Sequence, residues 1–520
     1  MSVGNSAIFK YIKFRSLLDR IKNKIQFKEK LVLSYSPSVL TNRLLQVINT
    51  ELMERFNGLE DLSKDYPFDR DININGIKIL PDSSVRIDGY LRIKCFTKFI
   101  MFWLLSFVYV YGYGKNKSKE KVCLMYGIPQ SAYMNENENE FSDYCEAVQI
   151  DSIVQSDHIF VQSSVLPNKV NIGKIHFVRR PLLSAIKNTK IGFDGLLKFF
   201  VGHISMLFYF PFVALRYPLL WLLWKDFAEQ TTATVLNQKH VLIGVIYTNS
   251  NLYNEPLWMT DLKDRDYRTS ISLYSLNSHP LITRDSPVDY EPEPCFKLLR
   301  ADEIFIWLSG YKDMLRRDGL TIMTKVAPPM LWQMPKSAKL SVSRNNQFQI
   351  TIFAVTPFSD EWLSKKGLDD TYYSYETMKL FIDDIIHVAH DLEINAMCKI
   401  DIVHKFKREP STEHNMSYIN HVDRMSSVHQ NLHNANYNSS IFDVLSETDV
   451  AVVIPFSSVS YVADWCGIPS IFYDPLAILQ KDYIKTPLIN FVDNRDALYT
   501  SIAKLCNNEN LLTHSVKSSD

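Results

Sequence analysis

Glycine is scarce in this chain: there are 16 among 520 residues, against 30 Phe, 27 Tyr and 8 Trp. The sequence contains no G-x-x-x-x-G-K-[ST] run. Its nearest approach to G-x-G-x-x-G begins at Gly112 and Gly114, but Lys117 stands where the third glycine is required. These absences exclude the P-loop nucleotide hydrolases and disfavour dinucleotide-dependent enzymes of the usual kind. Any phosphate that the chain binds must be held by something other than a glycine-rich loop.

An excess of one charge is also missing, because Lys+Arg and Asp+Glu both number 57. A balanced chain creates no long-range field for nucleic acid, so we expect no nucleic-acid partner. The seven cysteines include no C-x-x-C pair, which is typical of a reduced cytoplasmic protein without a disulfide framework or a zinc ribbon. No short apolar core with a small-residue cleavage site opens the chain, so we predict no signal peptide.

Basic and apolar residues are nevertheless concentrated in the N-terminal part. Residues 1–30 carry eight Lys or Arg, residues 99–113 contain no charge, and residues 196–224 are apolar but interrupted by charges and prolines. Neither run comfortably provides the ~20 apolar residues that a membrane-spanning helix needs, the first because of its length and the second because of its interruptions. Their basic flanks and their Trp and Tyr side chains predict two helices lying in the interface of one membrane leaflet. Two buried core helices are the alternative.

From about residue 240 onward, short apolar runs alternate with helical patterns, as parallel α/β sheets require. A first series ends at Pro328-Pro329, and a second begins with a strand at residues 349–355. We therefore predict an α/β protein with two tandem Rossmann-like domains and an N-terminal helical, hydrophobic, membrane-associating addition. The predicted domains are a basic N-terminal region with a hydrophobic helix (1–115), a first Rossmann-like domain with a hydrophobic insertion at 196–224 (116–330), and a second Rossmann-like domain (331–520).

Ligands of parallel sheets bind beyond the carboxyl ends of the strands, so the residues that follow each strand are the candidates. Ser457 and Ser458 follow the expected strand 450–454 and open a helix. Two hydroxyls, unpaired backbone N–H groups and the positive end of the helix dipole would bind phosphate without glycine. Ordinary N-capping by one serine is the alternative.

A basic run follows the expected strand 398–403, which we place next to the strand that precedes Ser457. Its cations suit the phosphates of a nucleotide sugar, and a solvated strand end is the alternative. Asp474, after the strand 470–473, would bind a ribose hydroxyl or simply begin a turn. The residues of the basic run are His404, Lys405, Lys407 and Arg408.

In the first Rossmann-like domain, Glu255 follows the expected strand 241–247. A carboxylate there could deprotonate an acceptor hydroxyl, although Glu255 would also suit an ordinary first helical turn. Asp264-Arg265-Asp266 has the form D-x-D, but it lies at the amino ends of the strands. We therefore predict no metal site.

Several runs in both halves together resemble a known family. They are Pro256-Leu257-Trp258, Tyr274 to Asn277 and Ala301 to Trp307 in the first half, and His404 to Arg408, Ser457 to Ala463 and Gly467 to Ser470 in the second. Over about residues 240–500, they resemble bacterial surface-polysaccharide biosynthesis proteins of the GT-B glycosyltransferase type, related to capsule and lipopolysaccharide transferases that use CMP-linked sugars such as Kdo or sialic acid. Those relatives carry a His-Pro or Lys-Pro pair in the basic run, and this chain lacks that proline.

The resemblance implies a metal-independent, membrane-associated glycosyltransferase without a cofactor. Its donor would be a nucleotide sugar, CMP-linked in the relatives, bound by Ser457, Ser458, the basic run and Asp474, with Glu255 and His404 as catalytic candidates. Its acceptor would be a growing polysaccharide or lipid-linked glycan on the cytoplasmic, inner face of the plasma membrane, where the protein would be peripheral. Two alternatives stay open: a sugar-nucleotide epimerase on the same scaffold, and a non-catalytic subunit of the polysaccharide assembly machinery.

Overall fold

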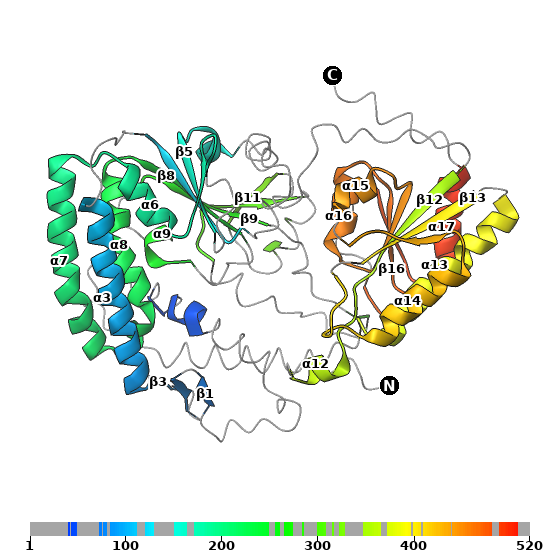
Figure 1. The fold of residues 1–520 in the computed structure, drawn as a ribbon, viewed down its shortest axis with the longest axis horizontal. Coiled ribbons are helices and arrows are strands. Elements are labelled where there is room, and N and C mark those ends of the chain that lie inside the picture. Colours follow the sequence, from blue (N-terminus) through cyan, green and yellow to red (C-terminus); the bar gives the residue numbers. More distant parts are fainter. Residues whose placement is uncertain are drawn as a thin grey trace.

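The computed structural model contains two parallel β-sheets in tandem, each flanked by helices (Figure 1). A small antiparallel sheet precedes them, formed by β1 (Ile72–Ile74), β2 (Ile77–Ile79) and β3 (Val85–Ile87). The structure describes residues 40–41, 43–48, 72–74, 76–80, 84–111, 120–128, 150–163, 171–248, 255–260, 265–273, 283–284, 299–307, 312, 315–316, 322–327, 347–365, 372–396, 399–406, 409–437, 439–480 and 488–507.

The first large sheet has the order β11-β10-β9-β8-β4-β5-β7-β6 and is parallel except for the short edge strand β6. The chain runs from β4 outward to β7 and then returns to β8 on the other side of β4. The pair β4 and β8 therefore flanks the topological switch point, where ligands of open sheets bind. The strands are β4 (Val122–Tyr126), β5 (His158–Gln162), β6 (Asn171–Ile172), β7 (Ile175–Val178), β8 (Leu242–Thr248), β9 (Arg268–Ser272), β10 (Glu303–Ile306) and β11 (Met323–Val326).

The second sheet is fully parallel and has the order β14-β13-β12-β15-β16-β17. Its switch point lies between β12 and β15, so β12 separates the strand of the basic run from the strand before Ser457. Our prediction that these two strands are neighbours was wrong, because the chain winds outward in both directions from β12. The strands are β12 (Gln347–Phe353), β13 (Lys399–Lys405), β14 (Leu432–Asn434), β15 (Val450–Val453), β16 (Ser470–Tyr473) and β17 (Ile489–Val492).

Helices cover both faces of the second sheet. One face packs on α13, α14 and α17, and the other on α15 and α16, which lie on the side of the first sheet (Figure 1). One continuous cluster of buried apolar side chains includes residues from both halves. The helices of this half are α12 (Asp360–Lys365), α13 (Tyr375–Ala396), α14 (Met416–Val428), α15 (Ile441–Leu445), α16 (Ser458–Trp465) and α17 (Arg495–Asn507). The prediction of an α/β fold with two Rossmann-like sheets is confirmed.

Two long helices, α3 (Gly89–Tyr111) and α7 (Gly192–Arg216), pack with α8 (Trp224–Gln238) beside the first sheet (Figure 1). Trp103 and His203 lock α3 to α7: the rings stack 5.1 Å apart, and each ring nitrogen lies within 2.9 Å of the other residue's carbonyl oxygen. The remaining helical elements of the first half are α5 (Asp151–Val154), α6 (Pro181–Asn188), the 3-10 helix η2 (Pro218–Leu223) and α9 (Leu257–Thr260).

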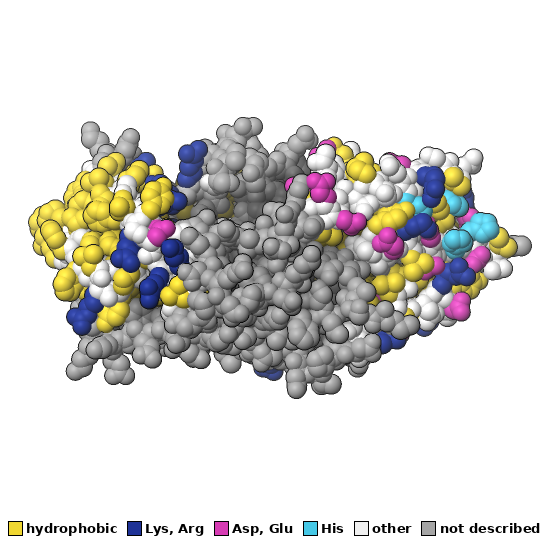
Figure 2. All heavy atoms as spheres, turned by 90° about the horizontal axis from the view of Figure 1, so that it is seen from below, with side chains coloured by type: hydrophobic (Ala, Val, Ile, Leu, Met, Phe, Trp, Pro, Cys, Tyr) yellow, Lys and Arg dark blue, Asp and Glu magenta, His cyan; other side chains and the backbone are white. Residues whose placement is uncertain are grey.

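The outer sides of α3 and α7 form a continuous exposed surface, which we call the apolar face. By length and composition either helix could cross a membrane, and only 28% and 22% of their most apolar segments are buried. They have 23 and 25 residues, so each helix is longer than the uninterrupted apolar run from which we expected no comfortable span. Figure 2 shows hydrophobic side chains gathered at this end of the molecule with Lys and Arg along the border. The face includes Ile93, Met101, Leu104 and Val108 on α3 and Phe193, Phe200, Phe208, Phe212 and Leu215 on α7.

One aromatic residue that we predicted to lie at the membrane belongs to the core instead. Trp221 is 5% exposed and contacts Phe96 and Phe210 edge-on at 5.9 and 5.1 Å. On α3 and α7, side chains such as Phe99 and Phe210 are buried while Met101 and Phe208 are exposed. Each helix therefore has a buried inner side, as a core helix has, and an exposed apolar outer side, as a helix at a membrane interface has.

Candidate functional site

The carboxyl ends of four strands meet at one edge of the second sheet. The register pairs Phe353 of β12 with both Lys405 of β13 and Val453 of β15, and Val453 with Phe472 of β16. The segments that contain Lys405, Ser457, Ser458 and Asp474 therefore start from the same edge. Lys407 and Arg408 lie outside the described residues.

The turn from β15 to α16 has an unusual backbone. Phe456 adopts φ +63°, a left-handed conformation that bulky residues rarely take. Its ring is held 5.8 Å from that of Phe472 and 6.0 Å from that of Phe491. Buried aromatic contacts thus enforce a tight turn, and α16 begins two residues later at Ser458.

The Ser457 and Ser460 hydroxyls of this turn do not stabilise the start of α16. Ser457 occupies the N-cap position of α16, but its side chain makes no capping hydrogen bond. Ser458 is buried, and so is Ser460, whose hydroxyl has no hydrogen-bond partner among the described residues. Because Ser457 does not act as an ordinary N-cap, its hydroxyl could reach an anion held at the start of α16.

A second Pro-Phe-Ser sequence, which we did not single out in the sequence, follows β12 on the other side of the switch point. Buried Thr356 precedes it, with a hydroxyl that has no partner in the described part of the chain. Phe358 stacks on Trp362 at 3.9 Å and lies nearly parallel to His414 at 5.4 Å. The repeat of Pro-Phe-Ser at 357–359 and 455–457 was the signal available in the sequence.

Lys405 and His404 point into the protein. The Lys405 ammonium donates to the carbonyls of Tyr437 at 2.7 Å and Phe406 at 3.3 Å, and burial lowers its pKa. His404 is 1% exposed, and its Nε2 lies 3.3 Å from the Tyr418 hydroxyl. Burial lowers the pKa of His404 to about 4. In this geometry Lys405 ties the strand end to residue 437, and His404 is a neutral core residue.

Asp474 is fully buried and organises the loop after β16. One carboxylate oxygen accepts from the Tyr372 hydroxyl at 3.0 Å and the Leu476 N–H at 3.2 Å, and the other accepts from the Leu479 N–H at 2.8 Å. The two backbone contacts are those of the turn alternative, and the Tyr372 contact is also internal to the protein.

The loop that Asp474 organises touches the first half of the molecule. Leu479 forms a β-bridge with Thr283, and the Arg284 N–H donates to the carbonyl of Ile478 at 2.8 Å. The Arg284 guanidinium also pairs with Asp493. We call this set of contacts the inter-half contact.

Glu255 belongs to a buried polar network in the first half. Its carboxylate accepts from the Tyr247 hydroxyl at 2.6 Å, the Gln46 amide at 3.3 Å and the Arg300 N–H at 3.3 Å. It is 2% exposed, and burial raises its pKa. Every contact of Glu255 is therefore internal, so an acceptor hydroxyl could reach it only after a rearrangement.

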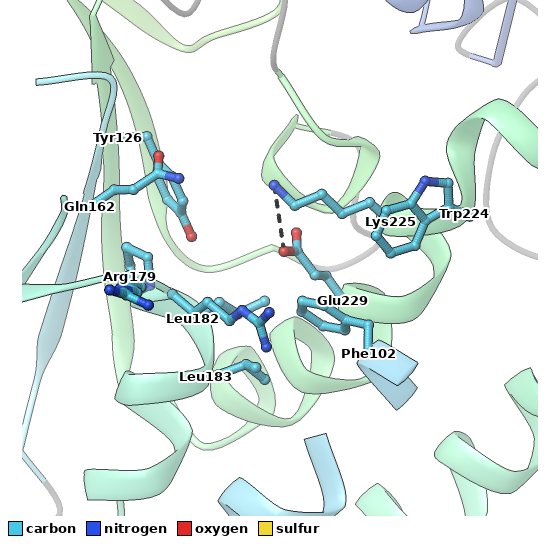
Figure 3. A pocket seen from close by; sticks show the side chains of 11 residues that line it. Phe102, Tyr126, Gln162, Arg179, Leu182, Leu183, Trp224, Lys225 and Glu229 are labelled. Carbon is cyan, nitrogen blue, oxygen red and sulfur yellow. Dashed lines mark ion pairs between the residues drawn. The ribbon is translucent and has the colours of Figure 1, made fainter. Parts of the chain in front are cut away.

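A pocket of about 210 Å³ opens at the carboxyl ends of β4, β5 and β7 (Figure 3). Tyr126, Gln162 and Arg179 come from these strand ends, and Lys225 and Glu229 reach in from α8. Lys225 lies 3.8 Å from the Glu229 carboxylate, which also accepts from the Trp258 indole at 2.8 Å. Our reading of the sequence missed this pocket because its residues come from separate elements and share no motif.

The D-x-D sequence takes part in ordinary ion pairs, as far as it is described. Arg265 pairs with Asp302 at 2.5 Å, and Asp266 with His240 at 2.8 Å. In the part of the chain that the structure describes, no group of three or more His, Cys, Asp or Glu could hold a metal ion.

Two parallel α/β sheets in tandem, each with a switch point, define a protein with two Rossmann-like halves. Residues 202–502 match the family described as "Polysaccharide biosynthesis PFTS motif protein", and the chain belongs to this family. Pro455-Phe456-Ser457-Ser458 differs from the letters P-F-T-S only by Ser457 in place of threonine, so the hydroxyl is kept. No curated protein sequence matches the chain.

Solved structures with a similar arrangement include the wall teichoic acid polymerase TagF, determined after a soak with CDPG. The TM-score is 0.36 at 9% identity, over 81% of this chain and 92% of that one. The trehalose-6-phosphate synthase OtsA gives a TM-score of 0.38 at 12% identity, over 74% of this chain and 91% of that one. TarM gives 0.29 at 10% identity, over 54% and 52%. At these scores the similarities define neither a donor nor an acceptor for this chain.

Proposed function

We propose that this chain is a glycosyltransferase that moves a sugar from a nucleotide-sugar donor to a cell-surface polysaccharide or lipid-linked glycan. The observation that carries the proposal is the switch point of the second sheet, where a strained Phe456 turn leads into α16 and the Ser457 hydroxyl caps nothing. Membership of a polysaccharide biosynthesis family supports the same role.

The donor phosphates would lie against Ser457, Ser458 and the first N–H groups of α16. There the positive end of the helix dipole and preorganised donors would stabilise the leaving phosphate without a metal. Lys407 and Arg408, which come two and three residues after the end of β13 in the sequence, would supply cations. Lys405 and Asp474 would act by fixing the strand end and the loop around the nucleotide, because their polar atoms already bind the protein.

The reaction would take place at the cytoplasmic face of the plasma membrane, with the protein peripheral. The apolar face of α3 and α7 supports this placement, because large exposed apolar patches mark interaction surfaces. Exposed Arg92, Lys94 and Lys98 near the start of α3 suit anionic lipid headgroups.

Donor binding is tested by thermal unfolding with CMP, CDP, UDP, GDP and their sugars. A nucleotide present at 100 times its Kd should stabilise the protein by about 2.7 kcal/mol. In the variant Ser457→Ala/Ser458→Ala, we expect affinity for that nucleotide to fall about 30-fold, or about 2 kcal/mol, because two phosphate contacts are lost.

The matched control is Ser426→Ala/Ser427→Ala, a pair of adjacent serines on α14 whose hydroxyls donate to backbone carbonyls of their own helix. It should bind the nucleotide like the wild type. Unchanged affinity in the Ser457/Ser458 variant would refute the donor site, and absence of stabilisation by every nucleotide would favour a non-catalytic subunit. Conversion of the free nucleotide sugar without an acceptor would identify an epimerase.

A further inference from the structure

The pocket of the first sheet lies at the carboxyl ends of β4, β5 and β7, the edge at which open parallel sheets bind ligands. Tyr126 ends β4, one of the two strands at the switch point, and Arg179 directly follows β7. Arg179 and Arg180 also immediately precede α6, whose first residue is Pro181. Two guanidinium groups therefore stand beside a helix start, at the ligand-binding edge of the sheet.

The charge of the pocket favours an anion. Lys225 adds a third cation, and among the described residues no carboxylate pairs with Arg179 or Arg180. Glu229 is the single acidic residue of the lining. Burial raises its pKa, which weakens the negative charge that opposes an anionic ligand.

One wall of the pocket is aromatic and comes from α3, which also carries part of the apolar face, and from the start of α8. Arg180 lies over the Phe102 ring at 5.5 Å, and the rings of Phe102 and Trp224 meet edge-on at 6.4 Å. Phe102 points inward from α3, whereas its neighbour Met101 is 65% exposed on the apolar face. The cationic pocket and the apolar face thus lie on opposite sides of α3.

We propose that this pocket binds the phosphate group of an amphiphilic acceptor, with Arg179, Arg180 and Lys225 as its ligands and Phe102 and Trp224 as the wall toward the lipid chain. A phosphate on an apolar chain combines the two chemistries that the structure places together. The assignment of this amphiphile as the acceptor rests on the proposed transferase function; its binding does not.

The test is calorimetric titration of the full chain with dodecyl phosphate below its micelle concentration, with inorganic phosphate and with the uncharged dodecyl maltoside. We expect dodecyl phosphate to bind, inorganic phosphate to bind at least tenfold more weakly, and the maltoside not to bind. Arg179→Gln/Arg180→Gln should weaken dodecyl phosphate binding tenfold to a hundredfold, because charge-assisted contacts are lost. The pocket residue Trp224 should report the same binding by a fluorescence change.

The control variant Lys190→Gln/Arg216→Gln removes the same charge from exposed positions outside the pocket lining and should bind like the wild type. Equal loss in both variants, or no loss in either, would overturn the site. Equal affinity for inorganic phosphate and dodecyl phosphate would overturn the proposal that the ligand is an amphiphile. Nucleotide-induced stabilisation is measured on the same variants. If the wild type binds a nucleotide but not dodecyl phosphate at the pocket, only this inference is contradicted. If it binds dodecyl phosphate at the pocket but no nucleotide, only the transferase function is contradicted.

Discussion

At the scale of single residues, burial decides which polar groups are free to act. His404 and Ser457 start from the same sheet edge, yet His404 is sealed in the core while the Ser457 hydroxyl caps nothing. From the sequence we could predict the Ser457 turn, because strand, turn and helix are contiguous there. The burial of His404 depends on Tyr418 and Phe406 packing around it, which a local pattern does not reveal.

His404 should make the stability of the second half depend on pH. Its pKa is about 4 in the folded chain against an ordinary value of 6.5, so an unfolded chain takes up the proton first as the pH falls. The contribution is present above pH 6.5 and is lost between pH 6.5 and 4, by about 3 kcal/mol. Urea unfolding of His404→Gln should therefore lose less stability over this range than the wild type.

The exposed His433→Gln is the control for that measurement, and its pH dependence should follow the wild type. If the wild type and His404→Gln lose the same stability between pH 6.5 and 4, the claim that His404 is buried as a neutral imidazole is refuted.

At the scale of elements, prediction succeeded where the periodic pattern and its end signals agree. Helix α16 ends at Trp465, and Gly467 two residues later adopts φ +74°, the left-handed conformation for which glycine is the usual end signal in a sequence. The strands β4, β5 and β7 were not singled out, because a fully buried strand such as Val122–Tyr126 shows no alternation. Helix α3 begins ten residues before the predicted apolar run, since Asp88 accepts from the Leu91 N–H at 2.7 Å and caps it.

The apolar face should decide membrane binding. We expect Phe208→Ser/Phe212→Ser/Leu215→Ser to reduce cosedimentation with vesicles of phosphatidylcholine and phosphatidylglycerol at least tenfold, because each side chain would lose about 1.5 to 3 kcal/mol if fully buried in lipid. Its thermal unfolding should be unchanged, since all three side chains are more than 60% exposed.

Ile394→Ser/Val428→Ser is the control for vesicle binding, because both residues are 66% exposed on helices of the second half. The control should sediment like the wild type. Equal sedimentation of the α7 variant and the wild type would show that the apolar face does not contact lipid.

At the scale of the whole molecule, the inter-half contact joins the loop organised by Asp474 to residues 283–284 of the first half. In Arg284→Ala, the ion pair with Asp493 and the bond from the guanidinium to the Leu479 carbonyl are lost. We expect amide exchange over residues 476–480 to become several-fold faster, while global stability falls by no more than ~1 kcal/mol. Hydrogen–deuterium exchange with mass spectrometry measures the exchange of residues 476–480, and urea unfolding measures the global stability.

Arg268→Ala serves as the control, because it removes an exposed pair with Asp151 inside the first half. Exchange over residues 476–480 should then match the wild type. Unchanged exchange in Arg284→Ala would show that the contact does not restrain the loop. None of these pairings could be predicted from the sequence, since they join residues of separate domains.

Helix α3 presents Met101 outward and Phe102 toward the cationic pocket. An α-helix with its side chains is ~10 to 12 Å across, so on a membrane α3 would act as a spacer that sets the height of the pocket above the lipid surface. Substrate capture would then become a search in two dimensions, along the membrane plane, and its rate would follow the surface density of the acceptor rather than its bulk concentration.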